Sequence, residues 1–218
     1  MSLDALLSTC AAGLAPGDLI LYHGTHPMHL LHERRTGCFW GQVGLILDLP
    51  PTGELGVFEA TRLSECVDVR LGQVVRGVQI VRLSDRVRSF TGRIAFRQLD
   101  PALDPGERHA LHAIAREWHG RPFNDDKWVG PNALRRRNPP SLQDRFFCSE
   151  LVAGAYQRLG VMAGPPQGHE ASNFVPGDFD SSYARSIVRL CNGRKLRPEW
   201  LLPQADDSPA LLRSDTPA

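Results

Sequence analysis

The most informative stretch of the 218-residue chain is FFCSELVAGAYQRLG, residues 146–160. Its apolar side chains recur at helical spacing, and Gly160 follows the last of them. We therefore predict a helix that ends at Gly160 and carries Cys148 in its first turn. The N–H groups of a helix N-terminus stabilise a thiolate and can bind the oxyanion of a tetrahedral intermediate. Cys148 is thus a candidate nucleophile, and the alternative is an inert buried cysteine.

The rest of the chain runs from predicted strands to predicted helices. Short apolar runs bounded by Gly, Pro and Asp predict strands at 19–22, 43–47, 56–60, 67–71 and 78–83. Helices are predicted at 2–14, 27–34 and 108–119, the last after the helix start Asp104-Pro105-Gly106-Glu107. Residues 124–145 are predicted to be irregular. The pattern indicates an α+β fold, with a curved antiparallel sheet or small barrel packed against helices that include the cysteine-bearing one.

Length and charge limit the possible classes of protein. We expect a single domain over residues 1–202 and a disordered polar tail over 203–218. A formal net charge of +1 argues against nucleic acid as a partner. The basic run Arg135-Arg136-Arg137 is interpreted as a solvated loop, with an anionic ligand or lipid surface as the alternative.

The cysteine pattern indicates the cellular compartment of the protein. The five cysteines are scattered and form no CxxC pair, which favours neither a disulfide framework nor a zinc knuckle. A reducing compartment follows, and we expect a cytoplasmic protein without an integral membrane segment. One hydrophobic core accounts for all the apolar runs. The sequence therefore gives no indication of an oligomeric state.

Four segments, in this order and spacing, resemble the motifs of the permuted papain-like amidases, the circularly permuted branch of the NlpC-type cysteine peptidase superfamily. The segments are Gly17-Asp18-Leu19-Ile20, Gly41-Gln42-Val43-Gly44-Leu45-Ile46-Leu47, Phe58-Glu59-Ala60-Thr61 and Phe147-Cys148-Ser149-Glu150-Leu151-Val152. A fifth, Ala171 to Phe179, is similar to the segment that follows the family's cysteine helix. The resemblance implies a papain-like fold and an acyl-enzyme on Cys148. It also implies that Glu59 orients the side chain at position 42, whereas the alternative for Glu59 is an exposed strand carboxylate.

The chain departs from that family at the general base. The family has Ser-His-Val-Gly where this chain has Gly41-Gln42-Val43-Gly44. A glutamine amide can hold geometry by hydrogen bonds, but it does not titrate near neutral pH and cannot shuttle a proton. His23, at the end of the first predicted strand, is the candidate replacement. A metal site formed by His23, His26, His29 and His32 is the alternative, and polar surface histidines are the third interpretation.

These residues support three functional hypotheses. The first is a cysteine hydrolase that acts on an amide of a small peptide, an amino acid or a lipid, with no cofactor and no metal. The second is an inactive papain-like protein that binds an acyl or peptidyl ligand. The third is a lipid acyltransferase or thioesterase, which would use the same cysteine with an acyl donor.

Overall fold

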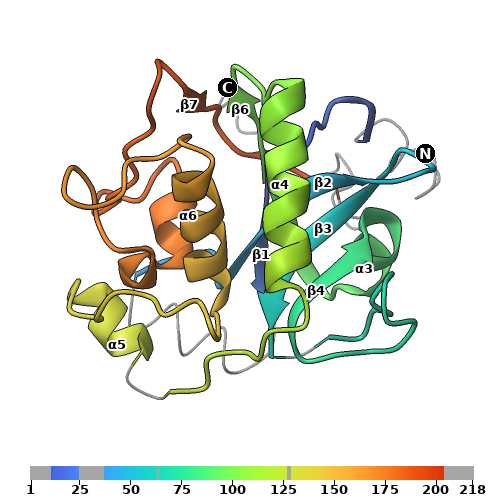
Figure 1. The fold of residues 1–218 in the computed structure, drawn as a ribbon, viewed down its shortest axis with the longest axis horizontal. Helices are drawn as coiled ribbons and strands as arrows, with labels where there is room; N and C mark the ends of the chain where they lie inside the picture. The colour runs from blue at the N-terminus through green and yellow to red at the C-terminus, as the bar shows by residue number, and fades with distance from the viewer. Residues whose placement is uncertain (1–10, 25–36, 63, 127–128, 204–218) are drawn as a thin grey trace, which may run out of the picture.

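The framework of the protein is an antiparallel six-stranded sheet with the strand order β4-β3-β2-β1-β5-β8 (Figure 1). A computed structural model describes residues 11–24, 37–62, 64–126 and 129–203. The strands are β1 (Leu19–Gly24), β2 (Gln42–Leu49), β3 (Glu54–Thr61), β4 (Gly77–Arg82), β5 (Gly92–Arg97) and β8 (Trp200–Leu201). The edge strands β4 and β8 do not pair with each other, so the sheet is open. The α+β prediction is confirmed, and the small-barrel alternative is wrong.

Helices and short turns complete the chain. The helices are α3 (Leu83–Ser89), α4 (Pro105–Trp118), α5 (Val129–Leu134) and α6 (Cys148–Arg158). Two 3₁₀ turns, η1 (Ala171–Asn173) and η2 (Pro176–Phe179), follow α6. A second, two-stranded sheet pairs β6 (Leu99–Asp100) with β7 (Lys195–Leu196). Within the described residues, no helix is long and apolar enough to cross a membrane.

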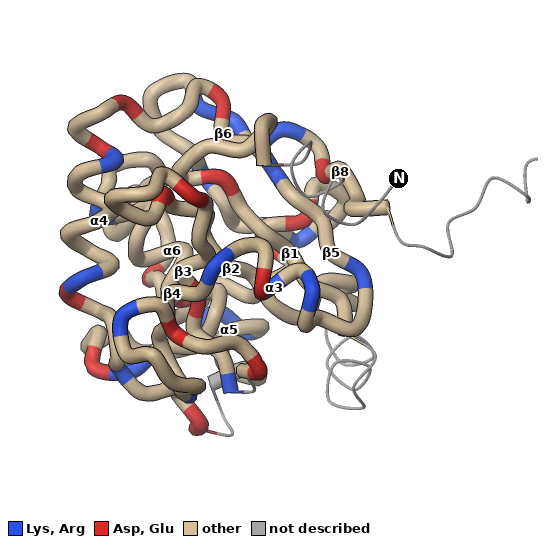
Figure 2. Tube along the Cα trace, turned by 90° about the vertical axis from the view of Figure 1, so that its right-hand side faces the viewer, with Lys and Arg blue, Asp and Glu red and all other residues tan. Residues whose placement is uncertain are grey.

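The two faces of the main sheet are covered by different helices. Alternation along a strand sends successive side chains to opposite faces. Leu21, Val43 and Phe58 therefore pack in one core cluster with residues of α4 and α6. Tyr22 and Val57 point the other way, into a second cluster with residues of α3. Figure 2 shows α4 on one side of the strands and α3 on the other.

Local sequence accounts for the long helices. At the start of α4 the Asp104 side chain accepts a hydrogen bond from Glu107 N, and the Glu107 side chain accepts one from Asp104 N, both at 2.8 Å. This capping box satisfies two N–H groups that the first turn leaves unpaired, as the sequence signature predicted. The apolar stripe of α4 then lies against the sheet, with Leu111 and Trp118 fully buried.

Several predicted elements differ from the structure. Residues 67–71 form no strand, because Asp68 Oδ1 accepts from the backbone N–H groups of Arg70 and Leu71 and closes a turn instead. The segment 124–145, predicted to be irregular, contains α5. Both α3 and β5 were absent from the prediction. The predicted helix 27–34, most of the predicted helix 2–14 and nearly all of the predicted tail lie outside the described residues.

Candidate functional site

Cys148 is the first residue of α6 and lies in the core rather than at the surface. Its residue exposure is 8%, and it belongs to the cluster that also holds Trp40 and Phe146. The preceding residue, Phe147, is extended, and its N–H donates to Glu150 Oε2 at 3.4 Å, which caps the helix. The apolar side chains around Cys148 thus separate the sulfur from water.

Strands β2 and β3 separate where the cysteine approaches them. Their ladder runs from Leu49↔Glu54 to Leu45↔Phe58 and ends there, whereas β3 continues to pair with β4 as far as Thr61↔Gly77. The Val43 N–H therefore lies beyond the ladder, and it hydrogen-bonds to the sulfur of Cys148. The open end of the β2–β3 hairpin thus provides a backbone donor beside the helix N-terminus.

Two opposing effects set the pKa of Cys148. Burial raises it, because a thiolate loses its hydration in the apolar core, whereas the N–H groups of Val43 and Ser149 lower it. Burial is the larger effect, and the pKa is raised to about 11. The sequence-based expectation of a thiolate favoured by the helix N-terminus therefore fails for the resting protein, in which Cys148 is a thiol at neutral pH.

Glu59 is the centre of a buried polar cluster on the α3 side of the sheet. Its Oε2 accepts from Gln42 Nε2 at 3.0 Å, and its Oε1 accepts from Gln79 Nε2 at 2.8 Å. The Nε of Arg86, from α3, lies 3.0 Å from the same Oε1. Glu59 is fully buried, so the alternative of an exposed strand carboxylate is wrong. The structure places Gln42 and Glu59 in contact.

Arg86 balances the charge of this cluster. Its guanidinium lies 4.7 Å from the ring centroid of Tyr22 and 5.4 Å from that of Phe90. Burial is the largest single effect and lowers the pKa of Arg86, but the ion pair with Glu59 and the contacts with Tyr22 and Cys66 together outweigh it, and the pKa is raised. Sequence reasoning missed Arg86, because the helix that carries it was not predicted. The sequence held one signal for it. Glu59 is a carboxylate in a stretch of strand, 56–60, that is otherwise apolar, and a buried carboxylate requires a buried cation nearby.

His23 lies on the opposite face of the sheet from Gln42, since it follows Leu19 and Leu21 in the alternation of β1. That face is the one that α6 covers. Its Nδ1 is 2.7 Å from the carbonyl oxygen of Phe39, and the two rings stack with centroids 4.0 Å apart. A carbonyl only accepts, so Nδ1 carries a proton, and Nε2 is the ring nitrogen that is left to accept one. His23 is therefore in the tautomer that a general base requires.

The other predicted histidine ligands, His26, His29 and His32, lie outside the described residues. Within the part of the chain that the structure describes, no group of three or more His, Cys, Asp or Glu side chains could hold a metal ion.

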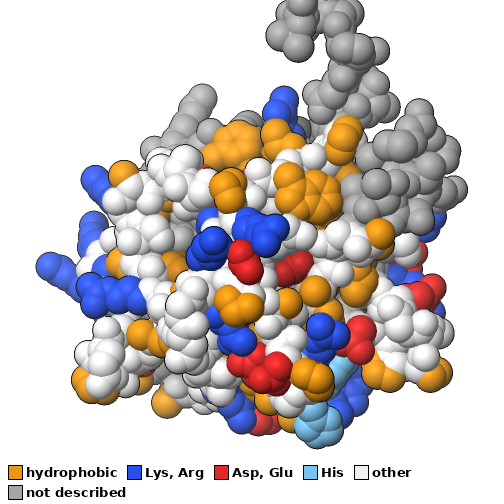
Figure 3. Space-filling view, turned by 90° about the horizontal axis from the view of Figure 1, so that it is seen from above, with side chains coloured by type: hydrophobic (Ala, Val, Ile, Leu, Met, Phe, Trp, Pro, Cys, Tyr) orange, Lys and Arg blue, Asp and Glu red, His pale blue; other side chains and the backbone are white. Residues whose placement is uncertain are grey.

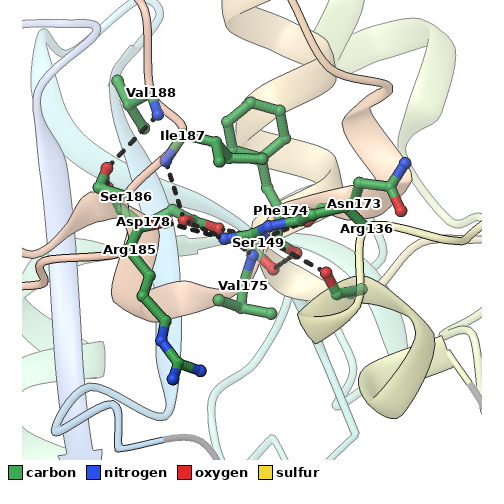
Figure 4. A network of polar contacts seen from close by, with 11 residues as sticks. Arg136, Ser149, Asn173, Phe174, Val175, Asp178, Arg185, Ser186, Ile187 and Val188 are labelled. Carbon is green, nitrogen blue, oxygen red and sulfur yellow. Dashed lines mark hydrogen bonds and ion pairs between the residues drawn. The ribbon is translucent and has the colours of Figure 1, made fainter.

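A second polar network fixes the loop before α6 to the segment after it (Figure 4). Arg136 binds Asp178 through two parallel hydrogen bonds, of 2.8 Å to Oδ2 and 2.7 Å to Oδ1. Asp178 Oδ2 also accepts from Val175 N at 2.7 Å, and Ser149 Oγ donates to Phe174 O at 2.8 Å. The network therefore connects the first turn of α6 with η2. Arg136 is the middle residue of the basic run 135–137, which we predicted to be a solvated loop. Its side chain is instead half-buried in this ion pair.

Two cavities flank the sheet. One, of about 550 Å³, is lined by residues near His23, among them Gly37, Phe39, Tyr183 and Arg185. The other, of about 410 Å³, lies between α4 and the β2–β3 hairpin. Neither of these two cavities is lined by Cys148.

Comparison with solved structures finds proteins of similar fold. No protein-family model matches the chain, and no curated protein matches it. A solved structure described as the metalloprotein yiiX from Escherichia coli is similar to it, with a TM-score of 0.48 and 18% sequence identity. The similarity covers 66% of this chain and 65% of that protein.

Proposed function

We propose that this protein is a cysteine-dependent hydrolase of the permuted papain-like type, which forms an acyl-enzyme on Cys148. The observation that carries the proposal is the position of the Cys148 sulfur, at the N-terminus of α6 and within hydrogen-bonding reach of the N–H groups of Val43 and Ser149. Two backbone donors from different elements that converge at one nucleophile are the arrangement that stabilises an oxyanion. The chain order, with the sheet first and the cysteine helix late, supports the permuted topology.

The reaction begins with removal of the thiol proton. In the proposal Nε2 of His23 accepts it while Nδ1 stays bound to the Phe39 carbonyl. The sulfur then attacks the carbonyl carbon of an amide, and the oxyanion binds the two backbone N–H groups. The amine leaves with the proton, and water hydrolyses the thioester to a carboxylic acid and the free thiol. Gln42, held by Glu59, transfers no proton.

The substrate class is an amide of a small peptide, an amino acid or a lipid. A cytoplasmic location is part of the same proposal, since the four cysteines that the structure describes are all free thiols. The cavity beside Phe39 is the proposed position of the leaving group, because Phe39, which lines it, stacks on the ring of His23.

The test is trapping of the acyl-enzyme with p-nitrophenyl butyrate, followed by mass spectrometry of the digested protein. We expect a butyryl adduct on Cys148, no adduct in Cys148→Ala, and less in His23→Gln. Gln42→His should raise the acylation rate by roughly 10² or more, because it puts a titratable group next to Val43, the donor to the sulfur, at the open end of the β2–β3 hairpin. Absence of the adduct from both the wild type and Gln42→His would disprove the proposal.

A binding protein is the second candidate, and two observations favour it. Cys148 is protonated at neutral pH, and Gln42 stands where the family has its base. On this hypothesis the protein binds an acyl or peptidyl ligand without turnover. The same experiment separates the two functions, because a binding protein would give an adduct in Gln42→His alone.

A further inference from the structure

A second site lies at the far end of the sheet from Cys148. The cavity of about 410 Å³ between α4 and the β2–β3 hairpin has an apolar base and a charged rim. Its apolar lining includes Leu47, Leu49, Val69, Ile80 and Ala115. Leu47, Ile80 and Ala115 belong to the main core, so the base of the cavity is part of the rigid framework.

The charges around this cavity do not cancel. Arg70, Arg82 and Arg116 line it together with the carboxylates Asp48 and Glu54. Glu54 pairs with Arg82, whose Nε lies 3.4 Å from Oε2. Asp48 Oδ1 lies 3.0 Å from Nε2 of His112 and accepts its hydrogen bond. Arg70 and Arg116 are left without an ion pair to any described residue.

This surplus of positive charge is local. The chain as a whole has a formal net charge of only +1, and Figure 3 shows basic and acidic side chains interspersed with apolar ones over the face that it presents. Two unpaired guanidinium groups beside a concave apolar surface therefore mark this cavity out from its surroundings.

We propose that the cavity binds a small organic anion, one that has an apolar body and a single carboxylate or phosphate group. The apolar body would contact Leu47, Ile80 and Ala115, and the anionic group would bind Arg70 and Arg116. Guanidinium groups suit this role because their planar donors match the oxygens of carboxylate and phosphate. A cavity of this volume accommodates a ligand of drug-like or metabolite size.

The cavity is independent of the cysteine. Strand β2 carries Val43, the donor to Cys148, near one end and Leu47 to Leu49, which line the cavity, at the other. Six residues of extended strand separate Val43 from Leu49 by about 20 Å. The proposal therefore does not depend on the function of Cys148, and Cys148→Ala should leave binding unchanged.

The experiment is calorimetric titration of the full chain with phenyl phosphate, benzoate, inorganic phosphate and benzyl alcohol. We expect saturable binding of at least one of the two aromatic anions. Inorganic phosphate lacks the apolar body and benzyl alcohol lacks the charge, so each should bind at least tenfold more weakly than that anion. Comparison of phenyl phosphate with benzoate identifies which anionic group the arginines prefer.

Three variants make the test specific. Arg70→Gln and Arg116→Gln should each weaken binding of the aromatic anion about tenfold, which corresponds to loss of one charge-assisted contact. Arg93→Gln, an exposed arginine of β5 that does not line the cavity, should not change it. Because all three side chains are exposed, circular dichroism should show folded protein in each case. Equal binding by all three variants, or no binding of either aromatic anion by the wild type, would overturn the proposal.

Discussion

At the scale of single residues, Cys148 is subject to a burial effect that opposes its position at a helix terminus. The backbone N–H groups of Val43 and Ser149 favour the thiolate, but the apolar core disfavours it more. The thiol is therefore kept protonated until something changes its surroundings. A substrate that displaces a core side chain, or a base that reaches the sulfur, would lower that barrier.

This balance predicts slow alkylation of Cys148 near neutral pH. The rate of reaction with iodoacetamide should rise about tenfold per pH unit from pH 7 and level off only near pH 11, because the thiolate is the nucleophile. Mass spectrometry of the labelled peptide measures the rate at this one cysteine. A plateau at or below pH 8.5, the ordinary value for a free thiol, would show that the sulfur is less buried than the structure indicates.

The buried ion pair of Glu59 and Arg86 gives a second prediction at this scale, because a buried charge that loses its partner destabilises the folded state. Arg86→Met should lower the free energy of unfolding by about 3–5 kcal/mol, and so should Glu59→Gln. The double variant should lose much less than the sum, since no unpaired charge remains. Urea denaturation measures all three.

The matched control for this cycle is Arg88→Met on the same helix. The Arg88 side chain is half-exposed, and its Nη1 lies 3.9 Å from Asp85 Oδ1. An exposed pair of this kind contributes less than about 1 kcal/mol. Strict additivity of the Glu59 and Arg86 variants would contradict the ion pair.

At the scale of elements, the first turn of α6 carries a buried carboxyl group. Burial raises the pKa of Glu150 to about 7, although Ser141 and the Phe147 N–H donate hydrogen bonds to it and lower it. In the unfolded chain the same carboxyl has its ordinary pKa, near 4.3. The folded state thus retains the proton between these two pH values, and stability decreases as the pH rises from about 4.3 to about 7.

Glu150→Gln should therefore stabilise the protein at pH 8 and have no such effect near pH 4. The amide oxygen can still accept from Phe147 N, and the penalty for ionising a buried carboxyl is removed. We expect a gain of up to about 3.5 kcal/mol at pH 8 in urea denaturation, which is the free-energy equivalent of the difference between the two pKa values. Asp18, whose pKa burial raises to about 6, is unchanged in the variant, so the difference between the two proteins isolates Glu150. A gain of the same size at both pH values would contradict the assignment.

The loop before α6 depends on Arg136. Arg136→Ala leaves Asp178 buried without its cation, and we expect a loss of about 3–5 kcal/mol together with faster amide exchange of residues 173–178. Arg135→Ala, at the exposed neighbouring position, should change stability by less than about 0.5 kcal/mol. Equal effects of the two substitutions would show that Arg136 is only a surface residue.

At the scale of the whole molecule, Arg97 joins the sheet to the C-terminal segment. Its guanidinium donates to the carbonyl oxygens of Arg197, Phe179 and Leu196, at 2.8, 2.8 and 2.9 Å. Its Nε also lies 3.2 Å from Glu199 Oε1. One side chain of β5 thus satisfies acceptors from two separate parts of the later chain, at Phe179 and at residues 196–199.

Arg97→Met should uncouple these parts and lower the free energy of unfolding by about 3 kcal/mol, because one buried and two partly buried hydrogen bonds lose their charged donor. Arg93→Met, on the same strand but exposed, serves as the control and should have little effect. Calorimetry measures both. Equal melting temperatures for Arg97→Met and the wild type would show that the C-terminal segment does not need this contact.

Local sequence was sufficient to predict a helix or strand wherever one physical rule determined its position. The capping box at Asp104 and Glu107 and the apolar periodicity of residues 151–159 fixed the positions of α4 and α6. Apolar runs between turns gave β1 to β4, because each strand is buried on both faces. The α+β class followed from the order of these elements.

Only the tertiary structure decided the chemistry of the candidate site. The sequence could place Cys148 at a helix start, but its pKa depends on how many apolar neighbours exclude water, which local pattern does not encode. It could pair Gln42 with Glu59, but Arg86 comes from a helix that sequence did not predict. Burial and long-range charge pairing are properties of the folded chain, because they depend on residues that are distant in sequence and become neighbours only when the sheet and its helices have packed.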